Sequence, residues 1–134
     1  MNAEPVLVDT SVWVEFLRQP DHPLSARLEA LLDADLARLC GPVIGELLQG
    51  AMTGKETAAV EELAESVPLL PVPEKTWFEA GRLARSLRAK GVTVGLMDCL
   101  LASVCMSEGC AVLSLDRHFK MISAHVPLSL ESVS

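Results

Sequence analysis

The sequence has no tyrosine, and it has only two tryptophans and three phenylalanines among its 134 residues. So few aromatic rings leave little scope for recognising nucleic-acid bases by stacking, and they require a core built mainly from leucine, valine and alanine. The chain also lacks any apolar run near the roughly 18 residues that a membrane-spanning helix needs. Half of the residues are nevertheless hydrophobic, so we expect a single domain over residues 1–134 with one substantial core.

The chain contains four cysteines, which are Cys40, Cys99, Cys105 and Cys110. No C-x-x-C pair or accompanying histidine pattern suits a zinc site. Cys99 and Cys105 fall in an apolar helical pattern, so we expect small buried thiols in a reducing compartment. No secretory signal pattern opens the sequence, because Glu4 and Pro5 interrupt its start, and the expected location is cytoplasmic.

The formal net charge is −7, from 11 basic and 18 acidic residues. That sign argues against attachment to nucleic acid through a broadly basic surface. Three explanations stay open: a solvated acidic surface, a basic partner, or a carboxylate cluster that binds divalent cations. Two divalent ions carry four positive charges and would reduce the net charge from −7 to −3.

Short apolar, β-branched runs alternate with helical patterns along the chain. We expect strands at about residues 5–8, 36–40, 68–72, 111–115 and 126–130, the third near an edge because of its prolines. We expect helices at about residues 12–18, 24–32, 42–50, 55–65, 74–90, 96–108 and 118–122. Ser11 could cap the first helix, and Trp13 and Trp77 fall on apolar stripes that predict burial. The alternation predicts an α/β fold with a mostly parallel sheet of four or five strands between helices.

Four acidic residues lie where such a sheet would bring its strand ends together: Asp9, Glu46, Asp98 and Asp116. Asp9 and Asp116 end the first and fourth strands. Glu46 follows the second strand within two helical turns, and Asp98 stands in the first turn of a buried helix. Each could instead serve locally, in a turn or at a helix terminus. If they converge, their repulsion requires cations, and oxygen-rich acidic sites suit Mg²⁺ and Mn²⁺.

The segments around these acids resemble, in the same order, those of the PIN-domain family and its VapC-type toxin ribonucleases. The segments are VDTSVW at 8–13, IGELLQG at 44–50, GLMDCLLA at 95–102 and VLSLDRHF at 112–119. The resemblance covers nearly the whole chain and implies a three-layer α/β/α sandwich. It further implies an endoribonuclease that hydrolyses RNA with a metal-activated water. One or two Mg²⁺ or Mn²⁺ ions would be held by the catalytic acids Asp9, Glu46, Asp98 and Asp116.

One position departs from the family pattern. Members often carry a further aspartate two places after the fourth acid, where this chain has His118. Its imidazole could bind a softer ion, approach a phosphate or face solvent, and solvent is the expectation. The hydroxyls of Thr10, Ser11 and Ser114 lie beside the acids and could orient carboxylates or water, although capping and turn formation would also explain them.

The sequence also suggests where an RNA substrate could bind. Arg82, Arg85 and Arg88 recur at every third residue and could contact phosphates, as could Arg117 beside the fourth acid. A solvated helix face is the alternative for the first three. By resemblance, the other partners are a small VapB-type antitoxin and a second copy in a homodimer, and no membrane is involved. The antitoxin would offer an arginine or lysine to the acids and place a segment in an apolar groove.

Three other interpretations of the acidic pattern differ in what they require of the sequence. A response-regulator receiver needs an aspartate ending its third strand and a lysine on its last, and residues 69–72 and 126–130 contain neither. A haloacid-dehalogenase-like phosphatase needs an aspartate two places after Asp9, where Ser11 stands. The alternative function is a catalytically silent PIN domain that binds protein or RNA.

Overall fold

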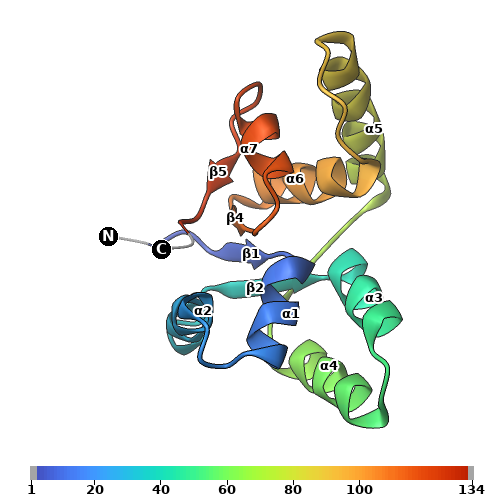
Figure 1. The fold of residues 1–134 in the computed structure, drawn as a ribbon. Helices are drawn as coiled ribbons and strands as arrows, with labels where there is room; N and C mark the ends of the chain where they lie inside the picture. The colour runs from blue at the N-terminus through green and yellow to red at the C-terminus, as the bar shows by residue number, and fades with distance from the viewer. Residues whose placement is uncertain (1–2, 133–134) are drawn as a thin grey trace.

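The computed structural model describes residues 3–132, in which a five-stranded sheet forms the centre (Figure 1). Its strands are β1 (Val6–Val8), β2 (Ala37–Cys40), β3 (Leu69–Leu70), β4 (Ala111–Leu113) and β5 (Ser129–Leu130). They are hydrogen-bonded in the order β3-β2-β1-β4-β5, and every neighbouring pair is parallel. All carboxyl ends therefore lie along one edge of the sheet, as the alternating pattern predicts, and β3 is an edge strand as expected.

Seven helices connect these strands within the described residues. They are α1 (Thr10–Arg18), α2 (Pro23–Asp33), α3 (Gly41–Gly50), α4 (Gly54–Ser66), α5 (Glu74–Ala89), α6 (Leu96–Glu108) and α7 (His118–Ser123). Figure 1 shows α1–α4 gathered beside β2 and α5–α7 gathered beside β4. The strand order runs outward from β1 in both directions, so right-handed crossovers place these two groups on opposite faces. The expected three-layer α/β/α sandwich is confirmed.

The core is built from aliphatic strands and the inward faces of the helices. Val6, Leu7 and Val8 of β1 are completely buried, because a parallel sheet is covered on both faces. Trp13 is equally buried, and its indole Nε1 donates a hydrogen bond of 3.0 Å to the carbonyl oxygen of Val8. The four cysteines are free and buried, as the sequence predicts. None of the helices in residues 3–132 is long and apolar enough to cross a membrane.

Two local expectations are wrong. Trp77 is 44% exposed, because the buried face of α5 passes through Thr76, Ala80 and Leu87, one position away from the tryptophan. Ser11 does not cap the first helix: α1 begins at Thr10 with Asp9 as its N-cap residue, and no side-chain capping bond forms there. The hydroxyl of Ser11 turns instead toward the Asp9 carboxylate, which places it at the candidate site.

Candidate active site

Asp9 occupies the central position of the site, directly after β1 and between two apolar segments. Its side chain is only 8% exposed, and its Oδ2 accepts hydrogen bonds from the hydroxyls of Ser114 (2.7 Å) and Ser11 (3.0 Å). Its backbone N–H donates to the carbonyl oxygen of Leu113, so β1 and β4 continue side by side to this point. The carboxylate is therefore held in one orientation by hydroxyls from two separate elements.

Glu46 lies on the neighbouring helix and is linked to Asp9 through Thr10. It stands in the second turn of α3, and its Oε1 accepts a 2.8 Å hydrogen bond from the Thr10 hydroxyl. The charges of both acids affect the thiol of Cys40, at the end of β2. The pKa of this thiol is raised to about 11, mainly because it is buried and in part because Asp9 and Glu46 are negatively charged. Asp9 and Glu46 thus act on the same region beyond β1 and β2.

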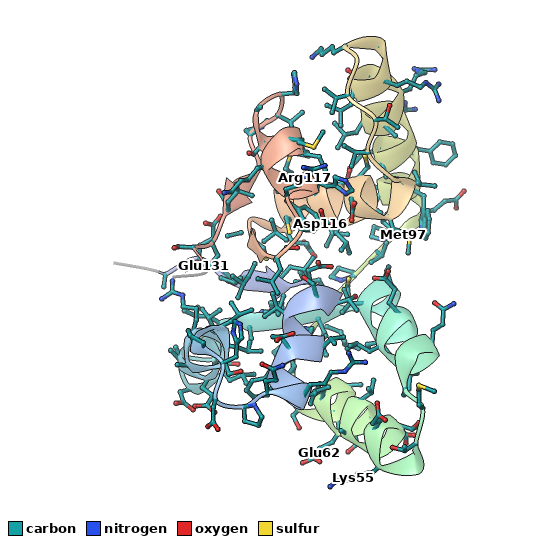
Figure 2. All side chains as sticks on the ribbon, in the orientation of Figure 1. Lys55, Glu62, Met97, Asp116, Arg117 and Glu131 are labelled. Carbon is teal, nitrogen blue, oxygen red and sulfur yellow. The ribbon has the colours of Figure 1, made fainter. Side chains whose placement is uncertain are left out.

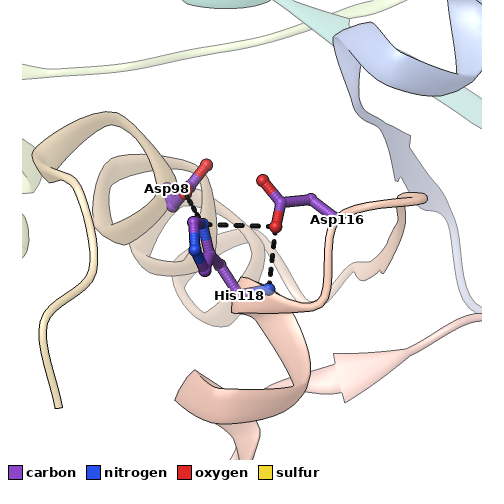
Figure 3. Close-up of side chains that lie close together, drawn as sticks. All are labelled: Asp98, Asp116 and His118. Carbon is purple, nitrogen blue, oxygen red and sulfur yellow. Dashed lines mark hydrogen bonds and ion pairs between the residues drawn. The ribbon is translucent and has the colours of Figure 1, made fainter.

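Asp98, Asp116 and His118 form the other part of the site (Figure 3). Asp98 comes from the first turn of α6, Asp116 from the loop after β4, and His118 is the first residue of α7. The Nδ1 atom of His118 lies 3.0 Å from Asp98 Oδ2 and 3.2 Å from Asp116 Oδ1. The expectation that His118 faces solvent is wrong, because its ring is turned into the acidic pair.

The local alternatives for Asp98 and Asp116 can now be compared with the geometry. No side-chain capping bond forms at the start of α6, so Asp98 does not act as a cap there. Asp116 Oδ1 does accept a 2.9 Å hydrogen bond from the backbone N–H of His118, which is a local turn interaction. The same carboxylate also faces the imidazole, so its turn role and its place in the cluster coexist.

Ser114 links Asp9 to Asp116 by hydrogen bonds, and the negative charges of Asp9 and Asp116 act on Asp98. The Ser114 hydroxyl donates to Asp9 and accepts from the backbone N–H of Asp116 at 2.9 Å. Partial burial is the main cause of the raised pKa of Asp98. The hydrogen bond from His118 lowers that pKa, while the charges of Asp116 and Asp9 raise it. A nearby cation would offset these effects and favour the ionised form of Asp98.

The donor set fits a divalent cation. Asp98, Asp116 and His118 each offer one ligand atom, and these atoms lie within 4.8 Å of one another. Asp9 and Glu46 lie outside this group of three in the described chain: Asp9 is linked to it through Ser114, and Glu46 is bound to Thr10, the residue after Asp9. All five residues lie beyond the carboxyl ends of the strands. This edge includes the point between β1 and β4 where the strand order reverses, the usual place for a site in an open parallel sheet.

The candidate phosphate-binding arginines differ in their distance from these acids. Arg117 is exposed and lines a cavity of about 480 Å³ together with Asp116, Ser114 and Lys120, and Figure 2 shows Arg117 beside Asp116. Arg82, Arg85 and Arg88 are exposed along α5, which rises away from the sheet in Figure 1. The structure thus places Arg117 in a cavity with one of the four acids, Asp116, and leaves the α5 set on a separate helix face.

A second cavity, of about 230 Å³, lies between α1, α3 and α4, and Glu46 is among the residues that line it. Val14, Leu17, Leu47 and Val60 supply its apolar lining. The sequence suggests apolar grooves between the N-terminal helices but does not single out these side chains, because their convergence depends on how three helices pack. The direction of the His118 ring was also missed, although its place two residues after Asp116 was a signal.

Comparisons with known proteins match nearly the whole chain. The PIN domain family model matches residues 6–124. Ribonuclease VapC32 of Mycobacterium tuberculosis is 37% identical over 131 residues, which cover 96% of this chain and 99% of that protein. Ribonuclease VapC11 of the same organism is 31% identical over 122 residues, covering 88% and 91%. The crystal structure of DNA-bound VapBC from Salmonella typhimurium superposes with a TM-score of 0.81 at 19% identity, covering 98% and 100% of the two chains, so the fold is shared.

Proposed function

The chain belongs to the PIN-domain family, and on that premise we propose that it is a metal-dependent endoribonuclease, the toxin of a toxin–antitoxin pair. Its reaction is the hydrolysis of internal phosphodiester bonds in RNA, which places it in the cytoplasm with its substrate. The observation that carries the proposal is the cluster of Asp98, Asp116 and His118, linked to Asp9 through Ser114, beyond the carboxyl ends of a parallel sheet, with two relatives named as VapC ribonucleases in support.

The carboxylates of Asp9, Glu46, Asp98 and Asp116 would hold one or two Mg²⁺ or Mn²⁺ ions. When bound, such an ion activates water and stabilises negative charge on the phosphate that is attacked. The hydroxyls of the chain orient the acids for this purpose. Ser11 and Ser114 hold Asp9, and Thr10 holds Glu46.

The protein's own charge makes RNA binding at this edge depend on cations. Four carboxylates repel a phosphodiester, and a net charge of −7 offers no broad attraction. Arg117 is the basic side chain best placed to contact a phosphate next to the scissile bond, because it shares a cavity with Asp116. Arg82, Arg85 and Arg88 would contact more distant phosphates along the same strand.

The groove between α1, α3 and α4 suits a VapB-type antitoxin. Its apolar lining would take a short hydrophobic segment, and Glu46, which also lines it, would take an arginine or lysine of that segment. A homodimer is also part of the proposal. The exposed apolar side chains at the starts of α5 and α6, Trp77, Phe78, Leu96 and Met97, are a candidate contact between two copies.

RNA cleavage by the purified, partner-free protein tests the proposed activity. We expect discrete fragments from total cellular RNA with Mg²⁺ or Mn²⁺, and their loss with EDTA. Asp9→Asn should lower the cleavage rate by more than about 100-fold, because it removes a charged donor from the centre of the site. Asp33→Asn, on the exposed part of α2, is the matched control and should cleave like the wild type. Equal cleavage by wild type and Asp9→Asn would refute the site, and a folded protein without cleavage would favour the silent binding module.

A further inference from the structure

The imidazole of His118 lies between two carboxylates that come from different elements. We propose that His118 Nδ1 is a metal ligand, which together with Asp98 and Asp116 makes a nitrogen-containing site that prefers transition-metal ions to Mg²⁺. This inference rests on the proposed function, because it concerns the same acidic cluster. It goes beyond that function by assigning a ligand role to the residue that departs from the family pattern.

The distances between the three donor atoms support this assignment. His118 Nδ1 is 3.0 Å from Asp98 Oδ2 and 3.2 Å from Asp116 Oδ1. Neighbouring ligands around a divalent ion with bonds of about 2.0–2.2 Å are separated by roughly 3 Å in octahedral geometry. The two nitrogen–oxygen separations therefore match those of adjacent ligands on one ion, and no rearrangement of the ring is required.

The backbone that carries the ring is held in position by its surroundings. His118 begins α7, and its backbone N–H is bound to the Asp116 carboxylate. Phe119 and Ile122 anchor α7 in the core, and α7 packs against α6, which carries Asp98. The three donors thus come from a rigid arrangement of α6, α7 and the loop after β4, as a metal site requires.

Hydrogen bonding alone explains the arrangement less completely. Nδ1 can carry one proton, whereas carboxylate oxygens from two different residues approach it at similar distances. A nitrogen lone pair directed at an ion shared with both carboxylates satisfies all three groups at once. Pulsed electron paramagnetic resonance separates the two cases, because a nitrogen bound directly to Mn²⁺ couples to it more strongly than a nearby unbound nitrogen.

The nitrogen donor changes which ion is preferred. Carboxylate sites suit Mg²⁺ and Mn²⁺, whereas imidazole nitrogen favours later transition metals, whose affinities rise from Mn²⁺ through Co²⁺. The mixed set of one nitrogen and two oxygens should therefore bind Co²⁺ and Mn²⁺ more tightly than Mg²⁺. An aspartate at position 118 would restore an all-oxygen set and shift the preference back toward Mg²⁺.

Metal binding by the full, untagged chain tests the proposal independently of cleavage. We would measure the affinities of Co²⁺, Mn²⁺ and Mg²⁺ by calorimetry and nitrogen coupling to bound Mn²⁺ by pulsed electron paramagnetic resonance. We expect His118→Gln to lower Co²⁺ affinity at least about 10-fold, to leave Mg²⁺ affinity within about threefold, and to abolish the nitrogen coupling. His118→Asp should raise Mg²⁺ affinity relative to Co²⁺. His125→Gln, an exposed histidine after α7, is the matched control and should change none of these values.

The outcomes separate this proposal from the proposed function. Wild-type protein that cleaves RNA and binds Mn²⁺ without nitrogen coupling would overturn the ligand role of His118 and leave the nuclease intact. Equal Co²⁺ affinity in wild type and His118→Gln would do the same. Wild-type protein that is folded by circular dichroism yet binds no divalent ion would overturn the ligand role together with the metal site itself.

Discussion

Replacing Ser114 by alanine removes the hydroxyl that joins the two halves of the acidic site. Ser114 Oγ donates to Asp9 Oδ2 at 2.7 Å and accepts from the Asp116 backbone N–H at 2.9 Å. The first contact is charge-assisted, and such bonds contribute about 1.5–3 kcal/mol. If it orients Asp9 for the reaction, its loss lowers kcat/KM by roughly 10- to 100-fold, because 1.4 kcal/mol corresponds to a factor of ten.

For Ser114→Ala we expect a loss of kcat/KM in the lower half of this 10- to 100-fold range. Ser11 also donates to Asp9 Oδ2, so one hydroxyl remains on the carboxylate. The double replacement of Ser11 and Ser114 should therefore lower kcat/KM by more than the product of the two single effects, as expected for residues that share a partner. Ser66→Ala, whose hydroxyl donates to a carbonyl of its own helix α4, is the matched control.

Single-turnover cleavage of an RNA that carries the mapped site is the assay, with thermal unfolding measured on the same samples. The reasoning about Ser114 is refuted if Ser114→Ala keeps the wild-type kcat/KM and metal affinity while remaining folded. Strong destabilisation with normal kcat/KM at low temperature would assign Ser114 to the fold alone.

Three further outcomes are expected. Trp13→Phe should lower the free energy of unfolding by about 2–3 kcal/mol in urea titrations, because it leaves the buried carbonyl of Val8 without its donor and removes packed volume; an unchanged midpoint would contradict this. Arg117→Ala should raise KM for RNA about 5- to 10-fold and reduce the slope of log affinity against log salt by about one, whereas Arg88→Ala, which would lose a more distant phosphate contact, should raise KM less. The pKa of Cys40 is raised to about 11, so only about one thiol in a thousand is ionised at pH 8; iodoacetamide should modify Cys40 at pH 8 only after unfolding, as checked by mass spectrometry.

The elements that depend on local sequence were predicted well. The strand expected at about residues 5–8 is β1 at Val6–Val8, and the helix expected over residues 96–108 is α6 at Leu96–Glu108. α6 ends there because Gly109 adopts a φ of 67°, a left-handed conformation that glycine adopts readily. The position of Trp77 was missed, because a helical stripe displaced by one residue still has several apolar members.

The contacts within the site cannot be predicted from local sequence, since they join residues far apart in the chain. Asp9 and Ser114 are 105 positions apart, and Thr10 and Glu46 are 36 apart. The sequence could place each acid near the edge where the strands end but could not show which hydroxyl would contact which carboxylate. The direction of His118 depends likewise on how α7 packs against α6.

The position of Glu46 couples the proposed partner to the proposed metal site. Glu46 accepts a hydrogen bond from Thr10, the residue after Asp9, and it also lines the apolar groove between α1, α3 and α4. A cationic side chain placed against Glu46 would compete with a metal ion for the same negative charge. Linkage requires that the metal weaken partner binding by the same factor as the partner weakens metal binding. Because Glu46 is exposed, the coupling free energy should be small, near the ~1 kcal/mol typical of solvated ion pairs. Efficient inhibition would therefore require that the partner also block the access of RNA to the site.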